Sequence, residues 1–507
     1  MEKTGIKTIY GLELRKVSRA LRALIVAQVF LLVIGLQAWG GHDYVKKVNC
    51  NKGETITEAL QKSDAKPITI EVKGTCNENV TIDRNDVTLI AHPSGGAISG
   101  VEPIDATIII NGDRAVIDGL TLTGGGGGIR VLGKNNMIRN CIVQNVGANG
   151  IPFPGGTGTV DNCTIQNSGQ NGVNVFNGGG VTVTNCTIQN SGIHGVNISG
   201  GGGATVTKST IQNNGIHGVN ISDGGRATVT NSTISSNNSH GIAFYKGGLG
   251  TVDQCTVQSN AGHGIRIEAA SATVINSMIS SNARCGIMVT KGGDARIGIS
   301  DPFQYAGNTI NNNQGNGIQL FIGGSAYIGG NTIAGNGTNP NSVHGQFGVG
   351  IFSSNAVLVG NNRITGSGGV GVFIGGSSVD IGNPGMGLPT TGDFANVISG
   401  NANGINGISG ASLSIQDAII NGNTGNGVTL AQRSTARISG GTIDNNTGNG
   451  ILLTVGGGLV LPIPTVTVTG NTLFGLQCTD NESSFIGNIS GILGNTGGDV
   501  SPSCTGF

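Results

Sequence analysis

Charged and aromatic residues are scarce in this chain of 507 residues: 11% are charged, 4% are aromatic and one is tryptophan. Proline is rare too, with 12 residues, and the 93 glycines follow no three-residue period, which excludes a collagen-like helix. Disorder also fits poorly, because disordered chains are charged and poor in branched aliphatic residues. Instead, Val, Ile and Thr alternate with polar residues along most of the chain, a pattern typical of β-strands.

The first 40 residues differ from the rest. Lys16, Arg19 and Arg22 precede an apolar run over residues 23–36, and small residues stand at a cleavage spacing around residues 38–40. This order predicts a secretory signal peptide. An uncleaved N-terminal anchor is the alternative, since the apolar run is near the lower limit for a membrane span. We therefore expect a secreted or cell-surface protein of bacterial origin.

The net charge of the chain limits the classes of partner that it can bind. Removal of residues 1–40 takes away six basic and two acidic side chains and leaves a net charge of −4. Such a surface has no general attraction for polyanions, so we expect no nucleic-acid partner. It weighs mildly against an acidic polysaccharide as well. Contact with a membrane is expected only through the N-terminal segment.

A short phrase recurs at steps of 22 or 23 residues. It reads CIVQN at Cys141 and CTIQN at Cys163, and it returns in related form at Cys186, Ser209, Ser232, Cys255 and Ser277. A fixed period of this length indicates stacked supersecondary units. Aligning the units places Val or Ile in two columns, one at residues 173, 196, 219, 242, 265 and 287, the other at 160, 183, 206, 229, 252 and 274. The sequence therefore predicts an all-β fold, a parallel β-helix with about 14 coils between Cys141 and Asn471.

The segments ITIEVKGTCNENVTI at 68–82 and IGNPGMGLPTTGDFANVISGN at 381–401 resemble coils of the pectate-lyase-like superfamily, in particular its carbohydrate-binding and sugar-hydrolase repeats. The resemblance covers residues 68–475 and implies a right-handed helix, as the crossover rule also does. Accordingly, we expect an N-terminal cap with the first coils at 41–100, the β-helix at 101–475 and a C-terminal cap at 476–507. An open terminal coil would expose a sheet edge, which is why caps are expected.

The nine cysteines fall into three groups. Four share the repeat position occupied elsewhere by serine, which indicates a small-residue core ladder: Cys141, Cys163, Cys186 and Cys255. Cys50 with Cys76, and Cys478 with Cys504, are pairs within the expected caps and are candidate disulfides in an exported protein. The last, Cys285, stands in a column of histidines.

That column is formed by the residue before a recurrent glycine. It contains His194, His217, His240 and His263, and neighbouring coils have asparagine there. Asparagine suits such corners because it tolerates left-handed backbone and hydrogen-bonds nearby amides. We therefore interpret the histidines as a structural ladder. The alternative is a row of ligands for a soft metal, but a linear row gives poor tetrahedral geometry, so we expect no metal and no cofactor.

Gly262-His263-Gly264 resembles the glycine-histidine-glycine signature of polygalacturonases. Such hydrolases need paired carboxylates for general acid and base catalysis, yet Asp253 has no partner on a neighbouring coil. The lyases of the superfamily need clustered carboxylates with a basic residue, and no such cluster stands in register. His263, Arg266 and Glu268 remain weak catalytic candidates.

Phe321, Phe352 and Phe373 are expected to share one outward position on consecutive coils, near long loops at 299–307, 338–346 and 383–394. Exposed aromatic rings in a row can stack on sugar faces, and long loops mark the variable side of a repeat. Alternatively, the loops fold over the phenyl rings as a satellite core. We predict an exported protein that binds a neutral or weakly charged extracellular glycan without catalysis. A polysaccharide lyase, glycoside hydrolase or epimerase and a purely structural surface rod are the alternatives.

Overall fold

The computed structural model describes residues 44–103, 106–300, 304–338, 345–382, 388–462 and 466–504. Contacts between residues separate the chain into Met1–Tyr44 and a compact unit, Val45–Phe507. The predicted signal peptide at 1–40 lies outside the described residues. Within the described residues, no helix has the length and apolar character needed to cross a bilayer.

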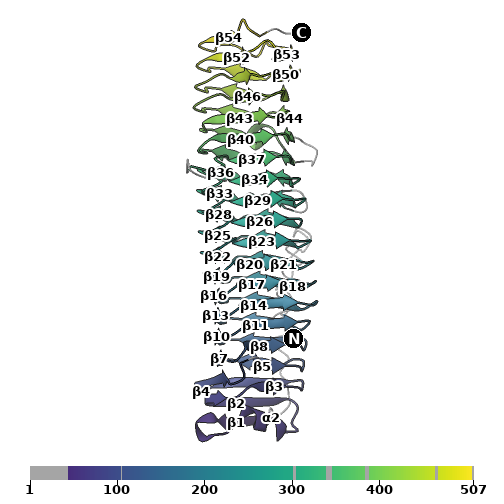
Figure 1. The fold of residues 1–507 in the computed structure, drawn as a ribbon, viewed down its shortest axis with the longest axis vertical. Coiled ribbons are helices and arrows are strands. Elements are labelled where there is room, and N and C mark those ends of the chain that lie inside the picture. Colours follow the sequence, from purple (N-terminus) through teal and green to yellow (C-terminus); the bar gives the residue numbers. More distant parts are fainter. Residues whose placement is uncertain are drawn as a thin grey trace, which may run out of the picture. The chain divides into compact units, whose positions relative to one another are not determined.

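The unit Val45–Phe507 is a right-handed parallel β-solenoid of about 19 turns (Figure 1). From Ile151 on, each turn contributes one strand to a 15-stranded sheet, called sheet I, whereas the earlier turns contribute β3 (Val80–Ile82), β5 (Ala106–Ile110) and β8 (Gly127–Val131) to a separate three-stranded sheet. The other strands of the turns belong to a 34-stranded sheet with two arms, called sheets II and III. In one turn, β11 (Ile151–Pro154) belongs to sheet I, β12 (Thr157–Asp161) to sheet II and β13 (Thr164–Ser168) to sheet III. The chain then returns to sheet I at β14 (Val173–Phe176).

Sheet I and its edge carry most of the candidate functional residues. Its strands after β14 are β17 (Val196–Ile198), β20 (Val219–Ile221), β23 (Ile242–Tyr245), β26 (Ile265–Glu268), β29 (Ile287–Thr290), β34 (Ile318–Phe321), β37 (Val349–Phe352), β40 (Val370–Gly375), β43 (Asn403–Ile408), β46 (Val428–Leu430), β49 (Ile451–Leu453), β52 (Phe474–Cys478) and β54 (Gly498–Val500). All pair in parallel with the next strand in this order.

The two predicted Val/Ile columns are confirmed by the strand registers. Val173 pairs with Val196 on sheet I, and Val160 pairs with Val183 on sheet II, with the later members following coil by coil. These side chains are completely buried. Because each fully buried Val or Ile contributes about 1.5–3 kcal/mol, stacking supplies the core that no single coil could form.

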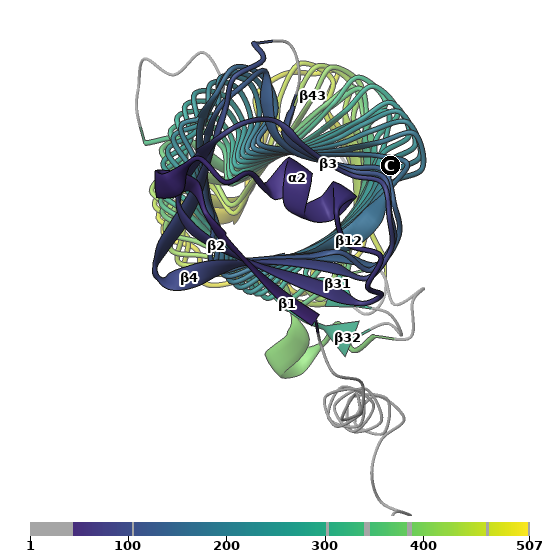
Figure 2. The ribbon, with the colours of Figure 1, turned by 90° about the horizontal axis from the view of Figure 1, so that it is seen from below.

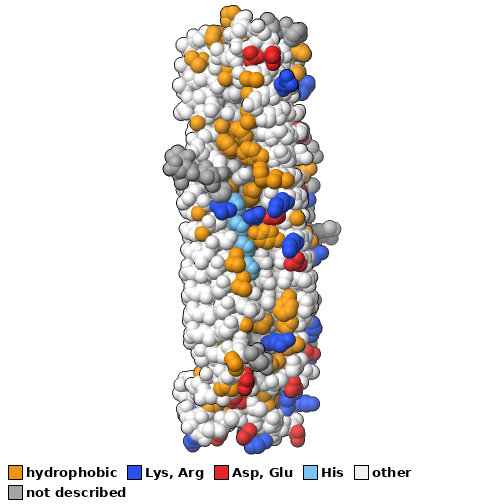
Figure 3. Space-filling view, in the orientation of Figure 1, with side chains coloured by type: hydrophobic (Ala, Val, Ile, Leu, Met, Phe, Trp, Pro, Cys, Tyr) orange, Lys and Arg blue, Asp and Glu red, His pale blue; other side chains and the backbone are white. Residues whose placement is uncertain are grey.

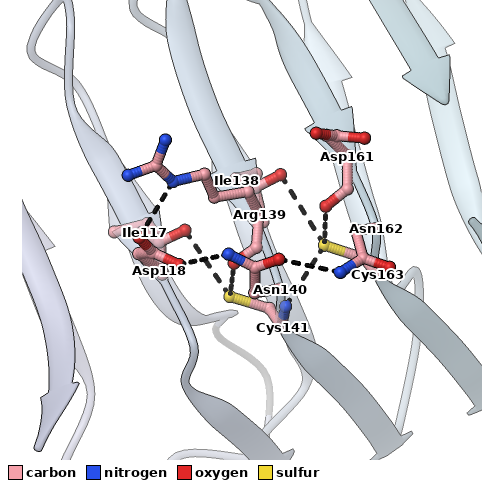
Figure 4. A network of polar contacts seen from close by, with 9 residues as sticks. All are labelled: Ile117, Asp118, Ile138, Arg139, Asn140, Cys141, Asp161, Asn162 and Cys163. Carbon is pink, nitrogen blue, oxygen red and sulfur yellow. Dashed lines mark hydrogen bonds and ion pairs between the residues drawn. The ribbon is translucent and has the colours of Figure 1, made fainter. Parts of the chain in front are cut away.

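The corner between sheets II and III explains the cysteine ladder (Figure 4). Asn140 and Asn162 adopt left-handed backbone there, and Asn162 Nδ2 donates to Asn140 Oδ1 at 2.8 Å. Cys141 Sγ donates to the Arg139 carbonyl at 3.1 Å, and Cys163 Sγ accepts the Cys141 N–H at 3.4 Å. Serine can perform the same tasks, which accounts for the exchange of Cys and Ser along the column: Ser209 Oγ accepts the Cys186 N–H at 3.1 Å.

The N-terminal end of the core is closed by α2 (Ile56–Gln61), which lies across the opening of the coils in Figure 2. Thr55 accepts the Glu58 N–H as N-cap, and the Glu78 carboxylate accepts the Ile56 N–H at 2.7 Å. Ile56 is fully buried. A disulfide joins Cys50 to Cys76 at this end.

About 14 coils were predicted between Cys141 and Asn471, whereas the whole solenoid has about 19 turns. Parallel pairing begins well before Cys141, where β2 (Ile68–Asn77) pairs with β4 (Val87–Gly100). The steps there are irregular, since β4 is long and pairs with both β6 (Val116–Asp118) and β7 (Thr121–Gly124), so the 22- or 23-residue period does not extend to them. At the other end, β53 (Ser484–Gly487) and β54 continue the pairing beyond residue 475, and Cys478 forms a disulfide with Cys504.

Candidate functional site

The corner between sheets III and I carries the histidines. The rings of His194, His217, His240 and His263 stack, with centroids 5.0, 4.9 and 5.1 Å apart in order along the chain. They form a narrow line along the face shown in Figure 3. His217, His240 and His263 are buried, and His194 is partly buried.

Each ring has a definite structural task. Nδ1 of His194 accepts the backbone N–H of His217 at 3.2 Å, and Nδ1 of His217 accepts that of His240 at 3.2 Å. The series ends with Nδ1 of His263 accepting the Cys285 N–H at 3.2 Å. In the preceding coil, Asn171 Oδ1 accepts the His194 N–H at 3.2 Å, so asparagine performs the same task. The hydrogen bonds therefore support a ladder role, with Nδ1 unprotonated in each ring.

Burial keeps these imidazoles neutral. It lowers the pKa of His194 to about 4 and, together with nearby positive charge, lowers the pKa of His217 and His240 to about 2. With Nδ1 occupied and the rings about 5 Å apart, two neighbours cannot share one ion in tetrahedral geometry. Among the described residues, no group of three His, Cys, Asp or Glu side chains could hold a metal.

A charged cluster lies beside the histidine line. Glu268 forms ion pairs with Arg266 at 2.5 Å and with Lys291 at 2.6 Å. Arg266 also lies over the Tyr245 ring, 5.7 Å from its centroid, and its Nη1 is 3.4 Å from His240 Nε2. Burial raises the pKa of Glu268, but the hydrogen bond from Lys291 and the charge of Arg266 outweigh this, so the pKa falls below its usual value. Glu268 is therefore a carboxylate at neutral pH and a poor proton donor.

The strand registers test whether carboxylates lie side by side. Asp253 pairs with Thr230 in one neighbouring coil and with Ile275 in the other. Glu268 pairs with Tyr245 and Thr290 in the same way. Neither acid has a second carboxylate at its own position on an adjacent coil, so the paired arrangement of glycoside hydrolases is not formed at these positions.

The phenyl rings form a cluster, but their predicted alignment was wrong for one of them. Phe321 pairs with Phe352 in register, whereas Phe352 pairs with Gly375 and Phe373 lies opposite Gly350. The sequences VGIF at 349–352 and VGVF at 370–373 look equivalent, yet Val349 pairs with Val372. The true offset is thus two residues, which moves Phe373 to the neighbouring outward position of the same face.

Sequence reasoning also missed Phe347, which joins the cluster from the histidine corner. Its ring stacks on Phe373 with centroids 4.4 Å apart, and Phe373 lies 5.2 Å from Phe352. Phe321 meets Phe352 edge to face at 6.3 Å and is 39% exposed. Figure 3 shows hydrophobic side chains gathered next to the histidine line, toward the C-terminal end. The sequence did contain a signal for Phe347: in FGVG at 347–350, Phe347 precedes a glycine just as the corner residue precedes the recurrent glycine in other coils.

The long loops lie only partly within the described residues: 301–303, 339–344 and 383–387 fall outside them. The described parts of the first and third do form a satellite core, with Ile299, Val359 and Leu388 buried. This core packs against Val357 of sheet II, so these parts do not pack over the phenyl rings of sheet I. Figure 2 shows β32 (Gln304–Tyr305), which pairs with β31 (Ile299–Ser300), outside the stacked coils.

Several solved structures match this chain at low sequence identity. The A-module of mannuronan C-5 epimerase AlgE4 from Azotobacter vinelandii is 13% identical, with a TM-score of 0.41 over 61% of this chain and 89% of that one. Pectate lyase Pel9A is 14% identical, with a TM-score of 0.33 over 62% and 76%. The catalytic unit of a GH87 α-1,3-glucanase from Streptomyces thermodiastaticus strain HF3-3 is 15% identical, with a TM-score of 0.28 over 91% and 70%. No curated protein matches this chain in sequence.

The family described as "right handed beta helix region" matches residues 127–272 and 263–383, which together span half of the chain. These residues contain the recurrent phrase, the buried Val/Ile columns and the parallel coils described above. The chain therefore belongs to the right-handed β-helix family.

Proposed function

We propose that this chain is an exported protein that binds an extracellular polysaccharide at the phenyl cluster, formed by Phe321, Phe347, Phe352 and Phe373, without turning it over. The observation that carries the proposal is the position of the cluster on the outer face of sheet I, with Phe321 39% exposed. Aromatic rings on a surface provide large rigid contact areas at low entropic cost, and the C–H faces of sugar rings pack against such surfaces.

Polar groups border the rings. Asn406 lies in register with Phe373, and its Oδ1 is buried without a hydrogen-bond partner. Gln319 lies in register with Gly350, where its Oε1 accepts from Cys285 Sγ at 3.0 Å. The side chains of Asn406 and Gln319 are partly exposed beside the rings and offer amide groups for hydrogen bonds with sugar hydroxyls. Stacking with a hydrogen-bonding rim suits a carbohydrate better than a purely apolar ligand.

Binding without catalysis is favoured by the state of the weak catalytic candidates. Glu268 is held by Arg266 and Lys291, and His263 Nδ1 is occupied by the Cys285 N–H. In this arrangement the lone pair of His263 Nδ1 is occupied and the Glu268 carboxylate is held by two cations, which disfavours both as general bases. The net charge of −4 without residues 1–40 favours a neutral or weakly charged glycan.

Export is part of the same proposal. The basic and apolar order of residues 1–40 has the form of a secretory signal, and disulfides at both ends of the solenoid suit an oxidising compartment. Five other cysteines form no disulfide and are buried, which protects them in such a compartment.

A glycan array tests the site. The wild-type protein should retain at least one glycan, and the double variant Phe321→Ala/Phe352→Ala should weaken its retention about tenfold or more, since only the row of rings gives useful affinity. Phe176→Ala is the matched control, because Phe176 lies on the same face in a coil far from the cluster. Retention should change little between about 50 and 500 mM NaCl. Equal losses in the control, or salt-sensitive binding that ignores the phenyl rings, would contradict the proposal.

A further inference from the structure

A second surface stands apart from the phenyl cluster, on the outer face of sheet II. It contains two shallow hollows, of about 350 and 210 Å³. Gly250 and Ala272 form the floor of the first, and Arg296 lies at its C-terminal end. Ala326 and Ala356 form the floor of the second. The alanines themselves point into the core, so only their backbone lines the floor, and the small outward side chains of Ser271 and Ser325 leave the hollows open.

The two hollows lie on successive coils of the same sheet face, and together we call them the sheet II groove. The first spans β24 (Leu249–Asp253), β27 (Ser271–Ile275) and β30 (Asp294–Ile297). The second spans β35 (Ser325–Ile328), β38 (Asn355–Leu358) and β41 (Ser378–Ile381). β30 pairs directly with β35, which brings Arg296 of the first hollow beside Tyr327 of the second. Six strands at about 4.8 Å spacing make the groove about 24 Å long.

A rigid ridge borders the second hollow. Val357 lines this hollow and also packs against the satellite core of Ile299, Val359 and Leu388. Tyr305 ties the two insertions of the ridge together, because its hydroxyl donates to the Pro389 carbonyl at 2.6 Å and its ring stacks on Phe394 at 6.0 Å. Insertions that interrupt a regular repeat and then pack into fixed structure are expected on its functional side.

The chemistry of the groove narrows the class of ligand. An added peptide strand is excluded, because the backbone of all six strands is already paired to neighbouring coils and offers no free edge. The hydroxyls of Ser271, Ser325 and Ser378 suit neither a lipid nor an apolar helix. The charged lining residues are two acids, Asp294 and Asp380, and one base, Arg296. This balance does not favour a nucleic acid, whose phosphates bind to basic surfaces.

An extended oligosaccharide meets these conditions. We propose that the sheet II groove is a second carbohydrate-binding site, which takes a linear oligosaccharide along the solenoid axis independently of the phenyl cluster. Tyr327, 39% exposed, supplies a stacking face in the middle of the groove. Asn355 and the serine hydroxyls supply hydrogen bonds along it, and the two ends carry Thr251 and Asp380.

Two sites on different faces would allow the protein to hold two glycan chains at once. If both sites bound the same polysaccharide network, binding at one site would raise the effective concentration of glycan at the other. The overall affinity would then increase without any contact between the two sites.

The test uses the full-length protein and an array of linear hexasaccharides: cellohexaose, xylohexaose, mannohexaose, maltohexaose and hexagalacturonate. Tyr327→Ala removes the stacking face, and Ser325→Trp fills the groove. Ser412→Trp is the matched control, because Ser412 occupies the same outward column as Ser378 one coil beyond the groove. For at least one hexasaccharide, both groove variants should raise the dissociation constant about tenfold or more, while Ser412→Trp leaves it unchanged.

The phenyl double variant separates this proposal from the first. A hexasaccharide lost in the groove variants and kept by Phe321→Ala/Phe352→Ala supports a second, independent site. If every retained hexasaccharide ignores Tyr327→Ala and Ser325→Trp, the groove proposal is overturned while the phenyl site stands. If the wild-type protein retains none of the five, the groove proposal is overturned as well.

Discussion

Asparagine and histidine alternate at the corner before the recurrent glycine because both can accept one backbone N–H from the next coil. Asn149 Oδ1 accepts from Asn171, Asn171 Oδ1 from His194, and His194 Nδ1 from His217, at 3.2 Å in each case. Cys285 ends the series, and the sequence at this corner becomes more variable toward the phenyl cluster. At this scale, the repeated octapeptide GIHGVNIS is explained by hydrogen bonding and requires no chemistry of the imidazole.

The acceptor role predicts opposite results for two variants of His217. His217→Asn keeps an acceptor and should change the free energy of unfolding by less than about 1 kcal/mol, whereas His217→Leu leaves the buried His240 N–H unpaired and should cost about 1–3 kcal/mol. Urea unfolding followed by circular dichroism measures both. Equal stability of the two variants would show that the hydrogen bond is not what the column requires.

The same burial predicts acid sensitivity. An unfolded histidine titrates near pH 6.5, but the folded pKa is about 4 for His194 and about 2 for His217 and His240. The unfolded chain therefore binds more protons between these values, so the stabilisation is complete above about pH 6.5 and is lost as the pH falls below it. Each histidine contributes a slope of up to about 1.4 kcal/mol per pH unit.

The double variant His217→Asn/His240→Asn tests whether the buried histidines cause the acid sensitivity. Its free energy of unfolding should fall less than that of the wild type between pH 7 and about pH 4.5, because two of the titrating groups are gone. Identical pH profiles for the two proteins would assign the acid sensitivity to other groups.

At the scale of the strand, the sequence predicted most registers and failed where coils differ in length. The Val/Ile columns followed from the fixed step, and their pairing is as expected. Phe373 was misplaced because VGVF resembles VGIF, although β40 is two residues longer than β37. The sheet II groove could not be predicted, since its ridge joins Tyr305 to Pro389, 84 residues away, through a side-chain hydrogen bond and side-chain packing that leave no pattern in the sequence.

The cysteine ladder and the end disulfides give a prediction at the same scale. Thiol titration of unfolded, non-reduced protein should find five reactive cysteines, and reduction should raise the number to nine. In the folded protein the five should react slowly, because they are buried and burial raises the pKa of Cys255 to about 11 and of Cys285 to about 12. Nine reactive thiols without reduction would mean that neither disulfide forms and would weaken the proposal of export.

At the scale of the whole solenoid, the periodic sequence determines the architecture because each coil is stable only against its neighbours. The repeated phrase could be followed in the sequence only as far back as Cys141, because the coils before it differ in length. In the structure, the parallel pairing continues to β2, and the helix α2 closes the end. Both proposed binding sites lie at departures from the repeat: the phenyl rings on sheet I, and the insertions that flank sheet II.

We propose above all that the protein binds a glycan and leaves it unchanged. The most direct measurement is mass spectrometry and NMR of a retained glycan recovered after prolonged incubation with the wild-type protein. The account predicts an intact chain, with no new reducing ends, no unsaturated sugars and no inverted centres, because Glu268 and Asp253 lack the partners that catalysis needs. Shortened, unsaturated or epimerised products that form with the wild type and disappear with His263→Asn or Glu268→Gln would contradict it.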